Sequence, residues 1–204
     1  MEEKTNFEYL SEFASATGME LEFSETPYPE PIFRKNLQKF KRIAYLYYRN
    51  DLRTFLLFHG DPYKIIGEHR IFFGAFCSSD LPIQTRLNFR KKDILDKINP
   101  STPKSGFKKF DSKFVATEKK FEIPKIISDD INIQKQIYES LGLTNNLHFS
   151  INNVNVNFVP SLRETSVVGI YQPQHWIIEK ELLKKMLYNI RHISNQIDRK
   201  IYER

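Results

Sequence analysis

The sequence predicts an α+β protein: a mostly antiparallel sheet with a meander core, an N-terminal helix and a long C-terminal helix packed on the sheet. Two patterns predict this class. Apolar residues recur at helical spacing near the start of the chain and again near its end. Between these segments, short apolar and aromatic runs alternate with turn residues, which is typical of strands joined by tight turns.

The first helix is predicted to begin after Thr5, whose hydroxyl can form a capping box with Glu8. Gly18 supplies its C-terminal stop. Residues 19–23 then alternate as a short strand does, and the prolines that follow predict an extended crossing: Pro27, Pro29 and Pro31.

The region from residue 40 to residue 89 is predicted to be mostly β. Its apolar runs are separated by turn residues such as Asn50-Asp51 and His59-Gly60-Asp61-Pro62. Consecutive strands with short connections favour an antiparallel meander. The expected strands are residues 43–48, 54–58, 65–77 and 85–89.

Residues 99–106 are the best linker candidate, because two prolines, a glycine and small polar residues make a poor helix or strand. We expect one domain over residues 1–204. It could be organised as two lobes, residues 1–98 and 107–204, joined by this segment.

The second half is predicted to contain a strand at 113–117, a helix capped by Asp129 or Asp130 and ended by Gly142, and a hairpin. The hairpin spans residues 147–158 and turns at Asn152-Asn153, with Asn155 and Asn157 facing water. Its alternating apolar residues are expected on one buried face: Leu147, Phe149, Ile151, Val154, Val156 and Phe158.

A long helix is predicted from residue 177 to about residue 200. Its apolar seam is one stripe wide and consists of Met186, Ile190, Ile193 and Ile197. Ser194 and Asn195 interrupt the apolar run too early for a coiled coil, so the helix is expected to pack on the sheet of its own chain.

Composition limits the class of protein. The single cysteine, Cys77, excludes an intramolecular disulfide and lies in an apolar run, where a buried small hydrophobe is expected. No signal peptide or membrane span is expected, so the predicted location is cytoplasmic. The net charge of +6 permits an anionic partner but does not by itself argue for one.

The order of these segments resembles an uncharacterised bacterial family of unknown function. The resemblance covers most of the chain and is carried by the segment from Ala14 to Glu22, by Leu87-Asn88-Phe89-Arg90 before Ile94 to Ile98, and above all by Phe110-Asp111-Ser112-Lys113-Phe114-Val115. The last of these is similar to that family's F-D-x-x-F-x-V strand. Many members carry membrane-spanning helices ahead of the domain, which are not expected here. The resemblance implies no known active site.

No catalytic, cofactor-binding or metal-binding residue is predicted, and no cofactor is expected. The five histidines lack the spacing of a zinc enzyme, and no phosphate-binding glycine loop or nucleophile elbow appears. Ser78-Ser79-Asp80 combines hydroxyls with a carboxylate, but a loop with a local turn is the favoured interpretation. Whether the chain is an enzyme stays open, and the sequence favours a non-enzyme.

The leading hypothesis is a non-catalytic protein-interaction or accessory module, because aromatic residues exceed what the core needs. A hydrolase or transferase with a dispersed active site is the alternative. The partner could be a protein, and the oligomeric state is open. The candidate partner surface consists of Tyr45, Tyr47, Tyr48, Tyr63, Lys108 and Lys109.

A second alternative is weak binding of single-stranded nucleic acid by the segment Lys104 to Phe121. Its lysines alternate with phenylalanines, which could supply phosphate contacts and base stacking. The favoured interpretation is a strand whose phenylalanines point inward while its lysines are solvated. Nucleic acid is therefore not the expected partner.

Overall fold

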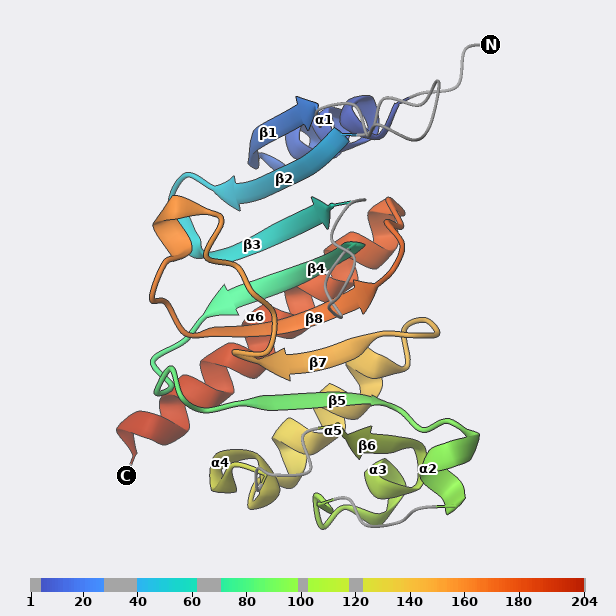
Figure 1. Cartoon of the computed structure of the whole chain (residues 1–204). Coiled ribbons are helices and arrows are strands. Elements are labelled where there is room, and N and C mark those ends of the chain that lie inside the picture. The colour runs from blue at the N-terminus through green and yellow to red at the C-terminus, as the bar shows by residue number, and fades with distance from the viewer. Residues whose placement is uncertain (1–4, 28–39, 62–70, 99–102, 118–122, 204) are drawn as a thin grey trace.

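A computed structural model describes residues 5–27, 40–61, 71–98, 103–117 and 123–203 (Figure 1). Its centre is an eight-stranded sheet in the order β1-β2-β3-β4-β8-β7-β5-β6, with antiparallel neighbours throughout. The strands are β1 (Glu20–Pro27), β2 (Phe40–Tyr48), β3 (Asp51–Gly60), β4 (Ile71–Ser78), β5 (Leu87–Lys91), β6 (Phe114–Ala116), β7 (His148–Ile151) and β8 (Val167–Pro173).

Three helices of useful length cover one face of this sheet. Figure 1 shows α1 behind β1 and β2, α6 crossing behind the middle strands, and α5 behind the lower strands. The short helices α2, α3 and α4 gather at the β6 end. The helices are α1 (Asn6–Thr17), α2 (Ile94–Ile98), α3 (Lys108–Lys113), α4 (Lys125–Ser128), α5 (Ile131–Leu141) and α6 (Lys180–Tyr202). The α+β class with a mostly antiparallel sheet is therefore confirmed.

The ends of α1 and α5 follow the predicted capping chemistry. The Thr5 hydroxyl accepts a hydrogen bond from the Glu8 amide at 3.3 Å, and the Glu8 carboxylate accepts one from the Thr5 amide at 2.7 Å. Gly18 ends α1 at φ +70°, a conformation that costs glycine little. Asp130 caps α5 by accepting from the amides of Asn132 and Ile133.

The meander prediction for residues 40–89 is confirmed for β2 to β4 and wrong for the strand after them. β5 does not pair with β4, because β8 and β7 lie between the two. β8 fits beside β4 through a close approach: a Cβ added to Gly169 would lie 2.3 Å from the Phe76 ring, so a side chain there would displace the ring. β5 pairs instead with β6 and β7, so strands from both sides of residues 99–106 share one sheet.

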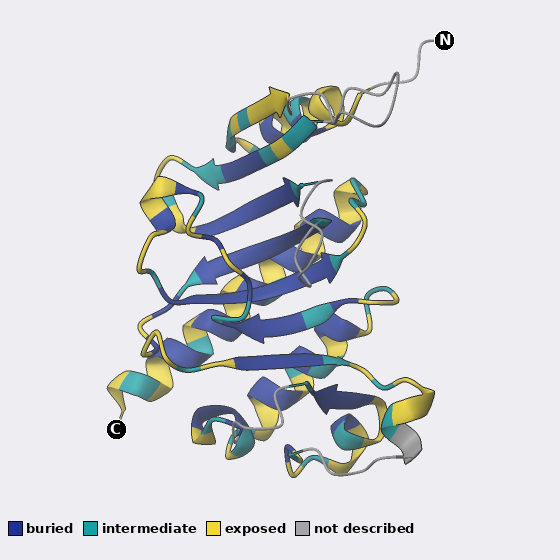
Figure 2. Cartoon of the chain, viewed as in Figure 1, coloured by how far each residue is buried: buried dark blue, intermediate teal, exposed yellow. Residues whose placement is uncertain are grey.

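Apolar side chains fill both faces of the sheet. The inner core lies under the helices and joins Phe13 of α1, Ile137 of α5 and Ile190 of α6 to the sheet. The outer core lies on the opposite face and is covered in part by residues 152–166, which we call the strap. The strap contains the 3-10 helix η1 (Pro160–Leu162), and Figure 2 shows that the central strands are buried along most of their length.

The predicted hairpin is correct in its first strand and wrong in its second. Residues 148–151 form β7, but residues 154–158 are not a strand and belong to the strap. The six predicted residues also divide between the two faces, because Phe149 packs in the inner core whereas Val154 and Val156 pack in the outer core. Five are buried, and Phe158 is half-buried. Asn155 and Asn157 are exposed, as predicted.

The C-terminal helix packs in cis, as predicted. The seam residues Met186, Ile190, Ile193 and Ile197 are fully buried, and α6 contacts β3, β4 and β8. The helix begins at Lys180 rather than at Ile177. None of the helices in the described ranges is long and apolar enough to span a membrane.

Candidate functional site

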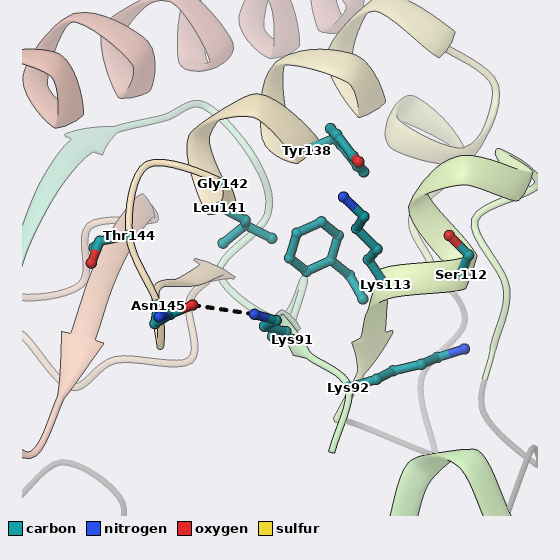
Figure 3. Close-up of a pocket in the computed structure, with 10 residues that line it drawn as sticks. Lys91, Lys92, Ser112, Lys113, Tyr138, Leu141, Gly142, Thr144 and Asn145 are labelled. Carbon is teal, nitrogen blue, oxygen red and sulfur yellow. Dashed lines mark hydrogen bonds between the residues drawn. The ribbon is translucent and has the colours of Figure 1, made fainter. Parts of the chain in front are cut away.

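At the β6 end of the sheet, β5, α3, β6 and the C-terminal end of α5 enclose a hollow of about 630 Å³ (Figure 3). Lys91 and Lys92 reach it from the end of β5, and Lys113 reaches it from the end of α3. Ser112, Tyr138 and Asn145 add hydroxyl and amide groups to its lining.

A second hollow of about 350 Å³ adjoins the first, and the two share Lys92, Ser112 and Phe114 in their lining. It adds Lys104 and Lys108. We call the two hollows together the lysine groove. Its lysines are Lys91, Lys92, Lys104, Lys108 and Lys113.

Three of the groove lysines contact neutral groups. The Lys91 ammonium donates to Asn145 Oδ1 at 3.2 Å, and the Lys92 ammonium donates to the Asp111 carbonyl at 2.5 Å. The Lys113 Nζ lies 5.2 Å from the centroid of the Tyr138 ring, and the Nζ of neighbouring Lys109 lies at the same distance. Figure 3 shows Lys113 reaching toward Tyr138 and the Lys91–Asn145 hydrogen bond.

No carboxylate in the described ranges forms an ion pair with these lysines. Of the described carboxylates, that of Asp111 lines the groove, and its oxygens accept hydrogen bonds from the Ser105 amide and hydroxyl and from the Gly106 amide. Its charge is thus engaged by the loop at residues 105–106. The lysines are left as a concentration of positive charge in a concave surface.

Nearby acidic residues are occupied by Arg90. The Arg90 guanidinium donates to both carboxylate oxygens of Asp96, at 2.6 and 3.0 Å. Burial acts to raise the pKa of Asp96, but these hydrogen bonds and the Asp93 amide outweigh it and hold the pKa below its ordinary value. Asp93 lies 3.4 Å from the same guanidinium. The carboxylates of Asp93 and Asp96 are therefore paired with Arg90 and not with the groove lysines.

Within the described part of the Lys104–Phe121 segment, Phe110 and Phe114 point inward as the favoured interpretation expects, whereas Phe107 is half-buried and the segment is not a strand throughout. Phe110 lies in α3, and Phe114 begins β6. Both rings are buried, with centroids 5.2 Å apart, and Phe110 meets Phe89 edge to face at 4.8 Å. Phe121 lies outside the described residues. The first residues of the F-D-x-x-F-x-V match are thus helical.

The residues of the candidate partner surface do not form one surface. Tyr45 is 4% exposed and packs in the outer core, while Tyr47 and Tyr48 are half-buried on β2. Lys108 and Lys109 are exposed on α3, at the other end of the sheet from β2. Tyr63 lies outside the described residues.

The Tyr47 hydroxyl donates to Glu22 at 3.0 Å, and this hydrogen bond raises the pKa of Tyr47. The Arg191 guanidinium lies 5.5 Å from the Tyr48 ring centroid. Both tyrosines therefore have partners within the chain.

The other residues considered for chemistry have structural partners. The Ser79 hydroxyl donates to Asp198 at 2.8 Å, and the Asp80 carboxylate accepts from the Tyr202 hydroxyl at 2.8 Å. His59 is buried in β3, not in a turn as expected, and its ring stacks on Phe72. Within the described ranges, no three His, Cys, Asp or Glu side chains are grouped to hold a metal.

Sequence reasoning missed Lys91, Lys92, Tyr138 and Asn145. Arg90-Lys91-Lys92 directly follows the strand predicted at residues 85–89, and this basic run is a signal that the sequence contains. Tyr138 and Asn145 carry no such signal, because only the packing of α5 against α3 and β6 brings them to the lysines.

Comparisons of this chain with protein-family models, with curated proteins and with solved structures find no match.

Proposed function

We propose that this chain is a non-catalytic interaction or accessory module, and that it holds an anionic group of its partner in the lysine groove. The observation that carries the proposal is the set of five lysines that line a concave surface and have no carboxylate partner in the described ranges. Ammonium groups held this way keep donors available for a phosphate or carboxylate.

The size and lining of the groove support binding. A hollow of about 630 Å³ is within the range of ligand sites. Ser112 and Asn145 can orient an anion through neutral hydrogen bonds. Among the described residues, no histidine lines either hollow, and the one carboxylate that does, that of Asp111, is already engaged. The groove therefore offers less for acid–base catalysis than for binding, and this favours the module over a hydrolase or transferase.

Nucleic acid is a weaker match for the same lysines. Binding of single strands draws much of its affinity from aromatic faces on which bases stack. Phe110 and Phe114 are buried, and the ammonium groups of Lys109 and Lys113 already lie against the Tyr138 ring. The groove supplies charge for phosphates but little surface for bases.

Titration with tripolyphosphate, a soluble polyanion, tests the proposal by calorimetry at low and high salt. The parent protein should bind, with an affinity that falls as salt rises. Lys91→Gln/Lys113→Gln removes two groove charges and should weaken binding about tenfold or more, since hydrogen bonds to charged groups are worth about 1.5–3 kcal/mol each.

Lys184→Gln/Lys185→Gln is the matched control, because it removes the same charge from an exposed part of α6. This variant should bind tripolyphosphate as the parent does. Absence of binding by the parent, or an equal loss in both variants, would contradict the proposal.

A further inference from the structure

Beside the lysine groove, α2 presents two aliphatic side chains to water. Ile94 and Leu95 are 75% and 74% exposed, although they are adjacent in a helix of five residues. They follow Lys91 and Lys92 in the chain, separated from them by Asp93 alone. Figures 1 and 2 show α2 as an exposed corner of the molecule at the β6 end of the sheet. We call Ile94 and Leu95 the aliphatic knob.

The knob is held in place by a local network. The Asp93 amide donates to the Asp96 carboxylate at 2.8 Å, and the Asp96 amide donates to the Asp93 carboxylate at 3.0 Å. Arg90, at the end of β5, binds Asp96 through both carboxylate oxygens. α2 is thereby tied to the sheet, so its exposed side chains are presented in a fixed position next to the groove.

We propose that the knob and the lysine groove together dock on an anionic lipid bilayer. The groove lysines take headgroup phosphates, and Ile94 and Leu95 enter the boundary between headgroups and acyl chains. This inference rests on the proposed function, because it names the partner that supplies the anion.

A bilayer suits this pairing of features better than a soluble partner does. The knob is convex, and a convex aliphatic pair needs no matching pocket when it enters a bilayer, whereas a folded partner would have to provide one. Each lysine near an anionic leaflet adds to binding, and stable attachment of a peripheral protein takes an apolar and a basic element together. The Asp93 carboxylate, which is close to the knob, lies 3.4 Å from the Arg90 guanidinium, and this reduces its repulsion of the leaflet.

Sedimentation with lipid vesicles tests the inference. The full chain should bind vesicles of phosphatidylcholine with about 30% phosphatidylserine, and should bind vesicles of phosphatidylcholine alone much more weakly. Ile94→Ser/Leu95→Ser should lower the partition coefficient about tenfold. Lys91→Gln/Lys113→Gln should lower it by roughly 10- to 30-fold.

Leu52→Ser/Ile83→Ser is the matched control for the knob. It also replaces two exposed aliphatic residues, which are 59% and 53% exposed, but Leu52 lies near the start of β3 and Ile83 lies in the loop between β4 and β5. This control should bind the anionic vesicles as the parent does. The thermal midpoint of each variant shows whether it is folded.

The outcomes separate this inference from the proposed function. Binding of tripolyphosphate without binding of anionic vesicles would overturn the bilayer and leave the groove intact. Binding of a soluble glutamate-rich peptide but not of vesicles would assign the groove to an acidic protein. Vesicle binding that is unchanged in Ile94→Ser/Leu95→Ser would overturn the role of the knob. If neither tripolyphosphate nor vesicles bind, both proposals fail.

Discussion

Asp198 of α6 is only 6% exposed, yet donors surround its carboxylate. The Ser79 hydroxyl and the Asp80 amide donate to Oδ1 at 2.8 and 3.3 Å, and the Arg53 guanidinium pairs with Oδ2. A buried charge is costly unless it is paired and hydrogen-bonded, and this one is both. The network joins the last turns of α6 to β3 and to the end of β4.

We predict that Asp198→Ala lowers the free energy of unfolding by about 2–3 kcal/mol. The change leaves the Ser79 hydroxyl and the Asp80 amide without their acceptor, at about 1–3 kcal/mol each. The half-exposed Arg53 side chain recovers part of its interaction from water. Urea unfolding measures the loss. Glu181→Ala, which removes an exposed carboxylate from the same helix, should cost less than about 1 kcal/mol, and equal losses in the two variants would refute the role of the network.

The burial of a single residue can be predicted where its neighbours in the sequence are apolar and its own side chain is apolar too. Cys77 lies among apolar residues, and the structure confirms that it is buried, which raises the pKa of its thiol. Tyr45 has apolar neighbours on both sides as well, and its alternate position on β2 places it in the outer core. A tyrosine has an apolar ring and a polar hydroxyl and occurs both in cores and on surfaces. Its residue type alone therefore does not predict whether it is buried.

At the scale of single elements, helix ends were predictable because capping is local. The Thr5–Glu8 and Asp130 caps involve residues at most three positions apart, so the sequence contains the whole interaction. The second strand of the hairpin was not predictable in this way. Val154 and Val156 alternate with exposed residues because the strap packs them against the outer core. An alternating apolar pattern can therefore arise without a partner strand.

Asn152 explains why the chain leaves β7 as a strap. It adopts φ +47°, and its side chain accepts from the Val167 amide at 2.8 Å and donates to the Thr85 carbonyl at 3.0 Å. Its side chain also exchanges hydrogen bonds with Ser166. These contacts hold both ends of the strap together and fix where it starts.

We predict that Asn152→Ala destabilises the protein by about 2 kcal/mol and exposes the strap. Alanine loses these hydrogen bonds and is strained at a positive φ. Limited proteolysis should cleave within residues 153–165 faster than in the parent, and urea unfolding should give the loss in stability. Asn155→Ala, at an exposed strap position, is the control. Similar cleavage in the two variants would show that Asn152 does not hold the strap.

At the scale of the whole molecule, the sheet order could not be predicted from local patterns. β8 and β7 lie between β4 and β5 in the sheet although they come far later in the chain. The residues of β4 do not indicate which strand will pair with it. The lysine groove depends on that order, because β7 pairs with β5 and also contacts α5, which places α5 beside β5, β6 and α3. Its lysines were visible in the sequence, but their convergence was not.

The α6 helix supports the sheet by covering its inner face. Truncation after Gln174 removes Trp176, whose indole donates to the His59 carbonyl at 3.0 Å, and the whole of α6. Burial of the four seam residues is worth about 1.5–3 kcal/mol each, which in sum rivals the stability of an entire domain. The truncated chain should therefore be insoluble or molten, with no cooperative urea transition and with strong binding of a hydrophobic dye. Cooperative unfolding near the parent's midpoint would show instead that the sheet is stable alone and that α6 is an appendage.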